Sequence, residues 1–187
     1  MNIVLFGPPG AGKGTQSKYL IKKLNSFQIS TGDLLRDEIK NNSDIGKAII
    51  EDMNCGKFVS DKVVNKLIEN HVNDPQKRNK LIFDGYPRSL GQAKNLDLIL
   101  KKSKQTISLI LFLNVDKDTI LKRLKKRKII EKRSDDEFDI ILKRYDTYME
   151  TTRPVLDFYI NNPNFKEIDG NMEIDEITRK IDTFINV

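Results

Sequence analysis

Histidine, cysteine and tryptophan are almost missing from this 187-residue sequence, which has one histidine, one cysteine and no tryptophan. The single cysteine, Cys55, excludes an internal disulfide and a zinc site built from cysteines. It indicates a reducing compartment, so we expect a cytoplasmic protein in which Cys55 packs as a small apolar side chain. The lone histidine, His71, is assigned no catalytic role. Catalysis is therefore expected to depend on other residue types.

Long apolar runs are also missing. No run approaches the roughly 20 residues that cross a membrane, and no basic region followed by an apolar stretch opens the chain, so we expect neither a membrane span nor a signal peptide. The composition, 38% hydrophobic and 32% charged, is typical of a soluble globular protein. The length predicts one domain. The net charge of +6 comes with scattered lysines, which favours solvated helix faces over a nucleic-acid surface.

The strongest local signal is the segment 7–15, which reads Gly-Pro-Pro-Gly-Ala-Gly-Lys-Gly-Thr. The apolar run 2–6 before it predicts a buried parallel strand, and residues 16–24 after it have helical spacing of apolar side chains. A strand, a glycine-rich turn and a helix N-terminus form a cradle for phosphate, because backbone N–H groups and the helix dipole both face the anion. Lys13 is placed to reach the terminal phosphates.

One position departs from the general phosphate-loop pattern. That pattern has Ser or Thr directly after the lysine, whereas Gly14 stands there and Thr15 follows. The usual hydroxyl ligand of magnesium is therefore displaced. This argues against a GTPase-like site and for a subgroup that holds its metal differently.

The rest of the chain alternates between predicted strands and predicted helices, which indicates an α/β fold with a parallel sheet covered on both faces. Short helices fill residues 31–72 with one strand nearby, which predicts an inserted subdomain; Thr31 is expected to be the N-cap of its first helix. Pro154 is expected to kink or end a long helix. The strands are predicted at 2–6, 27–30, 81–84, 107–113 and 165–168.

Charged residues complete the predicted phosphate site. Asp84 ends a buried strand, and one carboxylate can hold Mg²⁺ through its hydration shell. Arg123 and Arg127 are one helical turn apart, so both face the same way. Arg133 and Arg144 are about three turns apart and can share a face if a helix starts near Arg133. With Arg36 and Arg88, which follow glycine-containing turns, they predict a cage for several phosphates.

These motifs together resemble the adenylate kinases of the nucleoside monophosphate kinase family, in the short-lid form. The resemblance covers essentially the whole chain. It rests on 7–15, on 30–36 (Ser-Thr-Gly-Asp-Leu-Leu-Arg), on 84–88 (Asp-Gly-Tyr-Pro-Arg) with Gln92, and on the arginines from 123 to 144. It implies reversible transfer of a phosphoryl group from MgATP to AMP, giving two ADP, by a monomer that needs Mg²⁺ and no zinc.

The resemblance also implies a P-loop three-layer fold: a five-stranded parallel sheet with helices on both faces, a helical AMP-binding flap and a short lid loop. The single domain, 1–187, would divide into a core (1–29, 60–126 and 137–187), a flap (30–59) and a lid (127–136). The larger lid of many bacterial members, with its zinc-binding cysteines, is absent. Lys132 stands where short-lid members commonly have glycine, which predicts a stiffer or differently hinged lid.

The family's functional residues carry over to matching positions of this sequence. Those expected at ATP are Gly10, Ala11, Gly12, Lys13, Gly14, Thr15, Arg127 and, through its backbone and least securely, Met172. Those expected at AMP are Thr31, Arg36, Lys57, Phe58, Val59, Gly85, Tyr86, Pro87, Arg88, Gln92, Arg133 and Arg144. Those expected to stabilise the transferring group are Lys13, Arg88, Arg123, Arg133 and Arg144, with Asp84 at Mg²⁺.

Three other functions agree less well with the sequence. A UMP/CMP-type kinase usually has alanine where Thr31 stands and asparagine where Gln92 stands, so both positions favour AMP. A P-loop GTP-binding switch needs an Asn-Lys-x-Asp segment, and residues 79–82, Asn-Lys-Leu-Ile, lack its aspartate. A nucleic-acid-binding module would have clustered lysines with interleaved aromatics. Tyr86 replaces the family's usual phenylalanine, and its hydroxyl is expected at a polar cleft.

Overall fold

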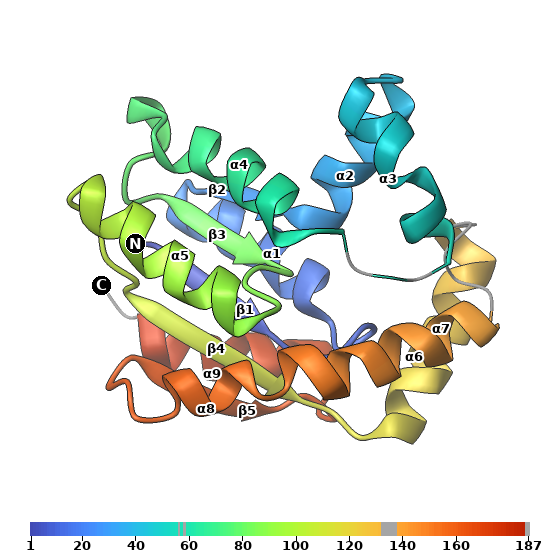
Figure 1. Ribbon diagram of the computed structural model, residues 1–187. Coiled ribbons are helices and arrows are strands. Elements are labelled where there is room, and N and C mark those ends of the chain that lie inside the picture. Colours follow the sequence, from blue (N-terminus) through green and yellow to red (C-terminus); the bar gives the residue numbers. More distant parts are fainter. Residues whose placement is uncertain (56, 58, 132–137, 186–187) are drawn as a thin grey trace.

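A parallel sheet of five strands lies at the centre of the computed structural model, which describes residues 1–55, 57, 59–131 and 138–185 (Figure 1). The strand order is β2-β3-β1-β4-β5, and each neighbouring pair is parallel. The predicted fold class is confirmed. The strands are β1 (Ile3–Phe6), β2 (Phe27–Ser30), β3 (Leu81–Asp84), β4 (Leu109–Asn114) and β5 (Phe165–Asp169).

Helices connect the strands and cover both faces of the sheet (Figure 1). A 3-10 turn, η1 (Pro75–Lys77), precedes β3, and a stretch of π-helix, η3 (Tyr148–Thr152), precedes Pro154. Arg127 to Glu131 belong to α6, so the described part of the predicted lid is helical. The α-helices are α1 (Lys13–Leu24), α2 (Thr31–Lys40), α3 (Asp44–Asn54), α4 (Asp61–Val72), α5 (Leu90–Lys102), α6 (Lys117–Glu131), α7 (Phe138–Thr147), α8 (Val155–Tyr159) and α9 (Ile174–Ile185).

The sheet separates two hydrophobic cores, because successive side chains of a strand point to opposite faces. In β1, Val4 and Phe6 belong to the core that α4, α5 and α8 cover, whereas Ile3 and Leu5 belong to the core that α1, α6 and α9 cover. All four side chains are buried, which explains why β1 has a continuous apolar sequence.

The helices α2 and α3 project from the sheet beside the N-terminal half of α4 (Figure 1). They pack closely on each other at Gly46, where a Cβ atom would lie 2.2 Å from the carbonyl oxygen of Glu38. Ser43 caps α3 by accepting a hydrogen bond from the N–H of Gly46 at 2.9 Å. The inserted helices predicted from the sequence are thus present as a compact hairpin.

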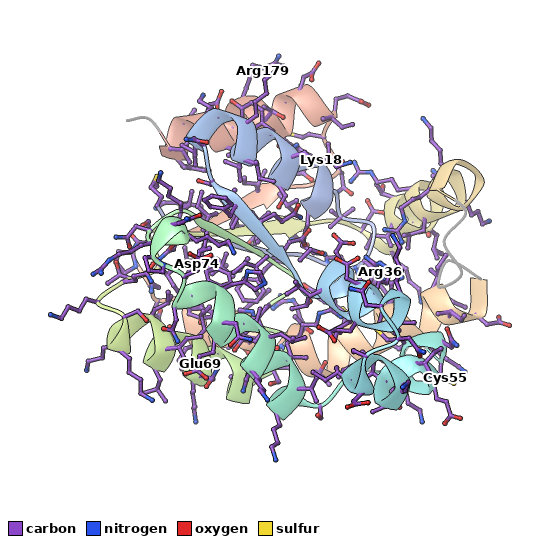
Figure 2. All side chains as sticks on the ribbon, turned by 90° about the horizontal axis from the view of Figure 1, so that it is seen from above. Lys18, Arg36, Cys55, Glu69, Asp74 and Arg179 are labelled. Atoms are coloured by element: carbon purple, nitrogen blue, oxygen red, sulfur yellow. The ribbon has the colours of Figure 1, made fainter. Side chains whose placement is uncertain are left out.

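Two local expectations are wrong. The N-cap of α2 is Ser30, whose Oγ accepts from the N–H of Asp33, while the hydroxyl of Thr31 turns away to donate to the carbonyl oxygen of Gly85 at 2.8 Å. The hydroxyl of Thr31, which the local sequence predicted as the N-cap of α2, therefore binds a residue that is distant in the sequence. Cys55 is exposed rather than packed (Figure 2). Among the described residues, no helix is long and apolar enough to span a membrane.

Two leucines of α5 test the core assignment. Leu96 is fully buried between α5 and the sheet, whereas Leu98 is 58% exposed. We expect Leu96→Ala to lower the free energy of unfolding by about 2–5 kcal/mol, because it leaves a cavity. Leu98→Ala should change it by less than about 0.5 kcal/mol. Urea unfolding followed by circular dichroism measures both, and equal effects would contradict the packing described here.

Candidate active site

The glycine-rich loop connects β1 to α1 at the carboxyl end of the sheet. Gly12 is the N-cap of α1 with φ +95°, and the first turn of α1 contains no acidic residue. The positive end of the helix dipole is therefore not neutralised by its own side chains. Gly10 has φ +84°, and a Cβ there would lie 2.8 Å from Cγ of Leu124 in α6. Glycine is required at this position both for the backbone conformation and for the close approach of α6.

Lys13 lies at the base of this loop. Its Nζ donates to the carbonyl oxygens of Gly7 at 2.7 Å and Pro8 at 3.1 Å. Burial lowers the pKa of Lys13 to about 8; nearby Asp84 acts in the opposite direction, and Arg88, Arg144 and Arg127 lower the pKa further. The ammonium group of Lys13 is thus influenced by the charges of the carboxylate and of three of the arginines that the sequence assigned to the phosphate site.

Asp84 ends β3 next to the loop. In the sheet it is paired in register with Leu5 of β1 and with Ser30 of β2. Its Oδ2 accepts a hydrogen bond from Nε2 of Gln28, a β2 residue, at 3.0 Å. A Cβ at Gly14 would lie 4.0 Å from the same oxygen, so Asp84 faces the N-terminus of α1. The glycine after Lys13 therefore leaves room beside the carboxylate.

A cleft of about 660 Å³ opens above these groups. This volume is within the usual range of small-molecule sites. Its walls come from the glycine-rich loop, the start of α2, the loop after β3, α6, α7 and the start of α9. The predicted residues that line it are Gly10, Ala11, Gly12, Lys13, Gly14, Thr15, Arg36, Asp84, Gly85, Pro87, Arg88, Arg123, Arg127, Arg144 and Met172.

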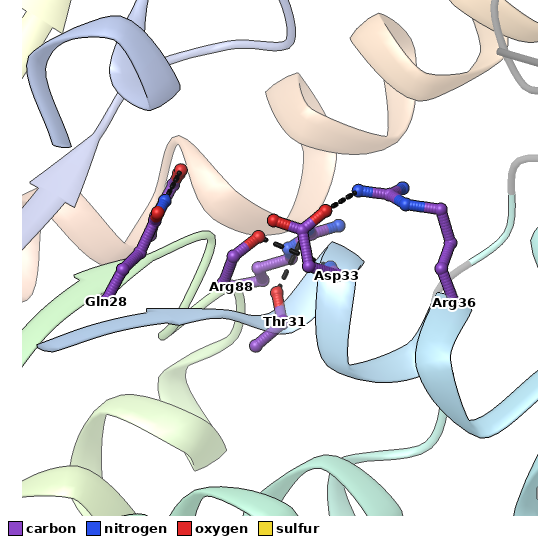
Figure 3. Close-up of polar contacts among 7 residues, drawn as sticks. Gln28, Thr31, Asp33, Arg36 and Arg88 are labelled. Carbon is purple, nitrogen blue, oxygen red and sulfur yellow. Dashed lines mark hydrogen bonds and ion pairs between the residues drawn. The ribbon is translucent and has the colours of Figure 1, made fainter. Parts of the chain in front are cut away.

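Hydrogen bonds position several of the cleft arginines (Figure 3). Arg88 donates through Nε to the carbonyl oxygen of Gly85 at 2.7 Å and through Nη2 to Oγ1 of Thr31 at 3.2 Å. Arg36 pairs with Asp33 at 2.5 Å. Nη2 of Arg123 donates to the carbonyl oxygen of Met172 at 3.4 Å. These guanidinium groups are therefore held by main-chain carbonyl oxygens, by the Thr31 hydroxyl and by the Asp33 carboxylate.

Other predicted residues lie behind the cleft wall. Thr31, Val59, Tyr86 and Gln92 are buried, and Lys57 is exposed outside the cleft lining. Phe58, Arg133 and Lys132 lie outside the described residues, as does the segment 132–137. The cleft thus brings together most of the residues predicted to bind phosphate. Thr31 and Gln92, on which the predicted choice of base rests, are buried and do not line it.

The hydroxyl of Tyr86 is not at a polar cleft, and that expectation is wrong. Its ring is buried, and the hydroxyl donates to Oδ1 of Asn65 at 2.7 Å and accepts from Nδ2 of Asn95 at 3.1 Å. Burial raises the pKa of Tyr86 to about 12. The extra oxygen therefore joins α4 to α5 inside the protein.

Sequence reasoning missed two polar residues of the cleft. Gln28 belongs to β2, whose sequence carries no functional motif. Its side chain reaches Asp84 because β2 pairs with β3. Asp33 was part of a motif without an assigned role, and its spacing of three from Arg36 on a helix was the available signal. Among the described residues, no three His, Cys, Asp or Glu side chains gather in a way that could hold a metal ion by themselves.

Comparisons with known proteins point to one family. The family model described as "Adenylate kinase" matches residues 5–164. The chain is 46% identical to an adenylate kinase of Pelagibacter ubique, with all of both chains covered. It is 40% identical to one of Bartonella henselae, covering 97% of each chain. It is also 40% identical to one of Flavobacterium psychrophilum, covering 100% of this chain and 98% of that one.

The lowered pKa of Lys13 predicts pH-dependent binding of anions. At pH 8 about half of the Lys13 side chains are neutral, whereas an ordinary lysine titrates near 10.5. Bound phosphate favours the charged form, so binding takes up protons near pH 8 and affinity falls between pH 7 and pH 9. Calorimetry with inorganic triphosphate in buffers of different ionisation enthalpy measures this uptake.

The Lys13→Arg variant is the control, because its guanidinium group stays charged over this pH range. Proton uptake measured with this variant therefore gives the protons that the triphosphate itself exchanges. Equal proton uptake by the two proteins at pH 8 would contradict the lowered pKa of Lys13.

Proposed function

Since the chain belongs to the adenylate kinase family, and is therefore a phosphotransferase that moves a phosphoryl group between ATP and AMP, we propose that its two nucleotides meet end to end above Lys13. The observation that carries this proposal is that Asp84, Arg88, Arg127 and Arg144 line the same cleft as Lys13 and that their charges act on its ammonium group. With Lys13, these groups come from four parts of the chain: the glycine-rich loop, the end of β3 with the loop after it, α6 and α7. Together they suit the phosphates of two nucleotides better than those of one.

The glycine-rich loop and α6 would bind ATP. The N-terminus of α1, with no acidic residue in its first turn, favours the β- and γ-phosphates. Arg123 and Arg127 lie one turn apart on α6 and both line the cleft. Met172, whose carbonyl oxygen accepts from Arg123, also lines the cleft and is proposed to border the adenine.

The helices α2 and α4 and the loop after β3 would bind AMP. Arg36 and Arg88 would take its phosphate, and Thr31 positions Arg88 through its Oγ1. Apolar side chains of α2 and α4, including Leu35 and Val64, pack beside Thr31 and would border the base. The remaining proposed AMP contacts are Lys57, Phe58, Val59, Gly85, Tyr86, Pro87, Gln92, Arg133 and Arg144, of which Phe58 and Arg133 lie outside the described residues.

The reaction requires positioning and charge neutralisation rather than a base. The phosphate of AMP already carries about −1.5 to −2 charge at neutral pH, so its oxygen can attack without losing a proton. Lys13 would hold the transferred group, and Arg88, Arg123, Arg144 and the proposed Arg133 would neutralise the charge on its equatorial oxygens. Holding both phosphates in line supplies much of the rate. Water must be excluded while this occurs.

Magnesium fits the residues that are present. Asp84 offers a carboxylate fixed by Gln28 next to Gly14, and one carboxylate with waters and phosphate oxygens is a usual magnesium site. When bound with ATP, the ion would neutralise phosphate charge at that position. Asp84 would hold it through its hydration shell.

AMP is proposed as the acceptor rather than UMP or CMP. Gln92 carries both an acceptor and a donor, which match the amino group and ring nitrogen of adenine. Thr31 also follows the adenylate pattern. The protein is further proposed to be a monomer that acts on small nucleotides in the cytoplasm. It would consist of a core, a flap (30–59) and a short lid (127–136). Having one cysteine in 187 residues favours a reducing compartment.

A bisubstrate ligand tests the end-to-end arrangement. A dinucleotide of two adenosines joined by five phosphates should occupy both halves of the cleft and inhibit competitively against ATP and against AMP. It should bind at least 100-fold more tightly than ATP, because it joins two binding events into one. Steady-state inhibition and calorimetry measure this, and affinity no higher than that of ATP would overturn the arrangement.

Replacing Gln92 tests base recognition. Gln92→Ala should raise the KM for AMP about tenfold and relax the preference for AMP over UMP, because two hydrogen bonds to the base are lost. A coupled assay with ATP as donor gives both quantities. Phosphorylation of UMP as efficiently as AMP by the unmodified protein would contradict the choice of base.

A further inference from the structure

The side-chain amide of Gln92 is held from both ends. Its Oε1 accepts from the main-chain N–H of Arg88 at 2.7 Å, and its Nε2 donates to Oδ1 of Asp61 at 2.7 Å. Gln92 is 3% exposed, so water does not compete with these two contacts. The amide is therefore fixed between the loop after β3 and the first residue of α4.

The carboxylate of Asp61 is itself fixed. Its Oδ2 accepts from Oγ of Ser89 at 2.7 Å, and the same Oγ caps α5 by accepting from the N–H of Gln92 at 3.1 Å. A Cβ at Gly91 would lie only 3.0 Å from Oδ2 of Asp61. The start of α4 thus packs closely on the start of α5, and Asp61 has little freedom to move away from Gln92.

These partners determine which way the amide faces. A main-chain N–H can only donate, so the amide atom opposite Arg88 must be the oxygen. An ionised carboxylate can only accept, so the amide atom opposite Asp61 must be the nitrogen. Turning the amide by 180° would place two donors together at Arg88 and two acceptors together at Asp61. Asp61 and Arg88 therefore exclude the turned amide.

One N–H and one oxygen lone pair of Gln92 remain for a ligand. In the fixed orientation they complement an edge that offers an amino group beside an unprotonated ring nitrogen, as adenine does. A 6-oxopurine offers the reverse, a carbonyl oxygen beside a ring N–H. Only the excluded orientation of the amide would fit that edge.

We propose that Asp61 is a positioning residue that sets base specificity, because it locks the amide of Gln92 in the orientation that accepts adenine and rejects 6-oxopurines. The inference rests on the proposed function, in which Gln92 contacts the base of AMP. Asp61 acts through Gln92 and does not touch the nucleotide. Ser89 supports it by holding the second carboxylate oxygen.

The test compares AMP with inosine monophosphate as phosphoryl acceptors. The ratio measured is kcat/KM for AMP divided by kcat/KM for inosine monophosphate. Asp61→Ala should lower this ratio about tenfold, because it removes one charge-assisted hydrogen bond that keeps the amide of Gln92 from turning. The change should lie mainly in the KM for AMP, with kcat within about threefold of the unmodified protein. Asp61→Asn should retain most of the preference, because its amide oxygen can face Gln92 while its nitrogen faces Ser89.

A double-mutant cycle separates positioning from general damage. In a Gln92→Ala background, Asp61→Ala should not change the ratio further. An unchanged ratio for Asp61→Ala alone, or an equal fall in both backgrounds, would overturn the proposal. If Gln92→Ala itself leaves the ratio unchanged, base reading by Gln92 fails, which is a failure of the proposed function rather than of the lock.

Glu69→Ala is the matched control. Glu69 is an exposed carboxylate on the same helix, α4, and should leave the ratio unchanged (Figure 2). Thermal unfolding checks that each variant is folded. Asp61→Ser, whose hydroxyl is too short to reach Gln92, replaces Asp61→Ala if the alanine variant does not fold, and the same fall in the ratio is expected of it.

Discussion

The repulsion among cations around Lys13 is the constraint on which the site depends. An ammonium group and several guanidinium groups face one cleft, and burial adds to the free energy of keeping Lys13 charged. Carbonyl oxygens of Gly7 and Pro8, together with Asp84, partly offset this repulsion. Bound phosphates offset it much more completely. The repulsion among these cations therefore favours the binding of polyanions such as the phosphates of nucleotides.

Polar side chains from neighbouring elements keep this arrangement fixed. Gln28 holds Asp84, Thr31 and Gly85 hold Arg88, and Asp33 holds Arg36. Each of these contacts joins groups that lie close to the carboxyl ends of β2 and β3 (Figure 3). The parallel sheet therefore does more than place the loops, since it also brings together the side chains that orient the charged groups.

The parts of the fold that depend on local sequence were predictable. The strand, glycine loop and helix around Lys13 follow from residues adjacent in the chain, and Asp84 follows from its place at the end of an apolar run. The roles of Thr31 and Tyr86 did not follow. Thr31 satisfies the rules for an N-cap, but the carbonyl oxygen of Gly85 takes its hydroxyl.

The same reason explains the missed contacts of Tyr86, Gln28 and Asp61. The hydroxyl of Tyr86 finds its partners on α4 and α5, and Gln28 finds Asp84 across a strand pair. Asp61 meets Gln92, which is 31 residues away in the sequence. No periodicity or motif in one sequence encodes such pairs, because they form only once helices and strands are packed. Local patterns identified the charged groups, and packing decided how those groups are oriented.

The division of the interior by the sheet has a consequence for how the protein tolerates change. The core containing Val4 and Phe6 lies under α4 and α5, beside the proposed AMP half, and the core containing Ile3 and Leu5 lies under α1, α6 and α9, beside the proposed ATP half. Among the side chains that the structure describes, none belongs to both cores. A substitution that changes the packing of one core therefore reaches the other core only through the backbone of the shared sheet.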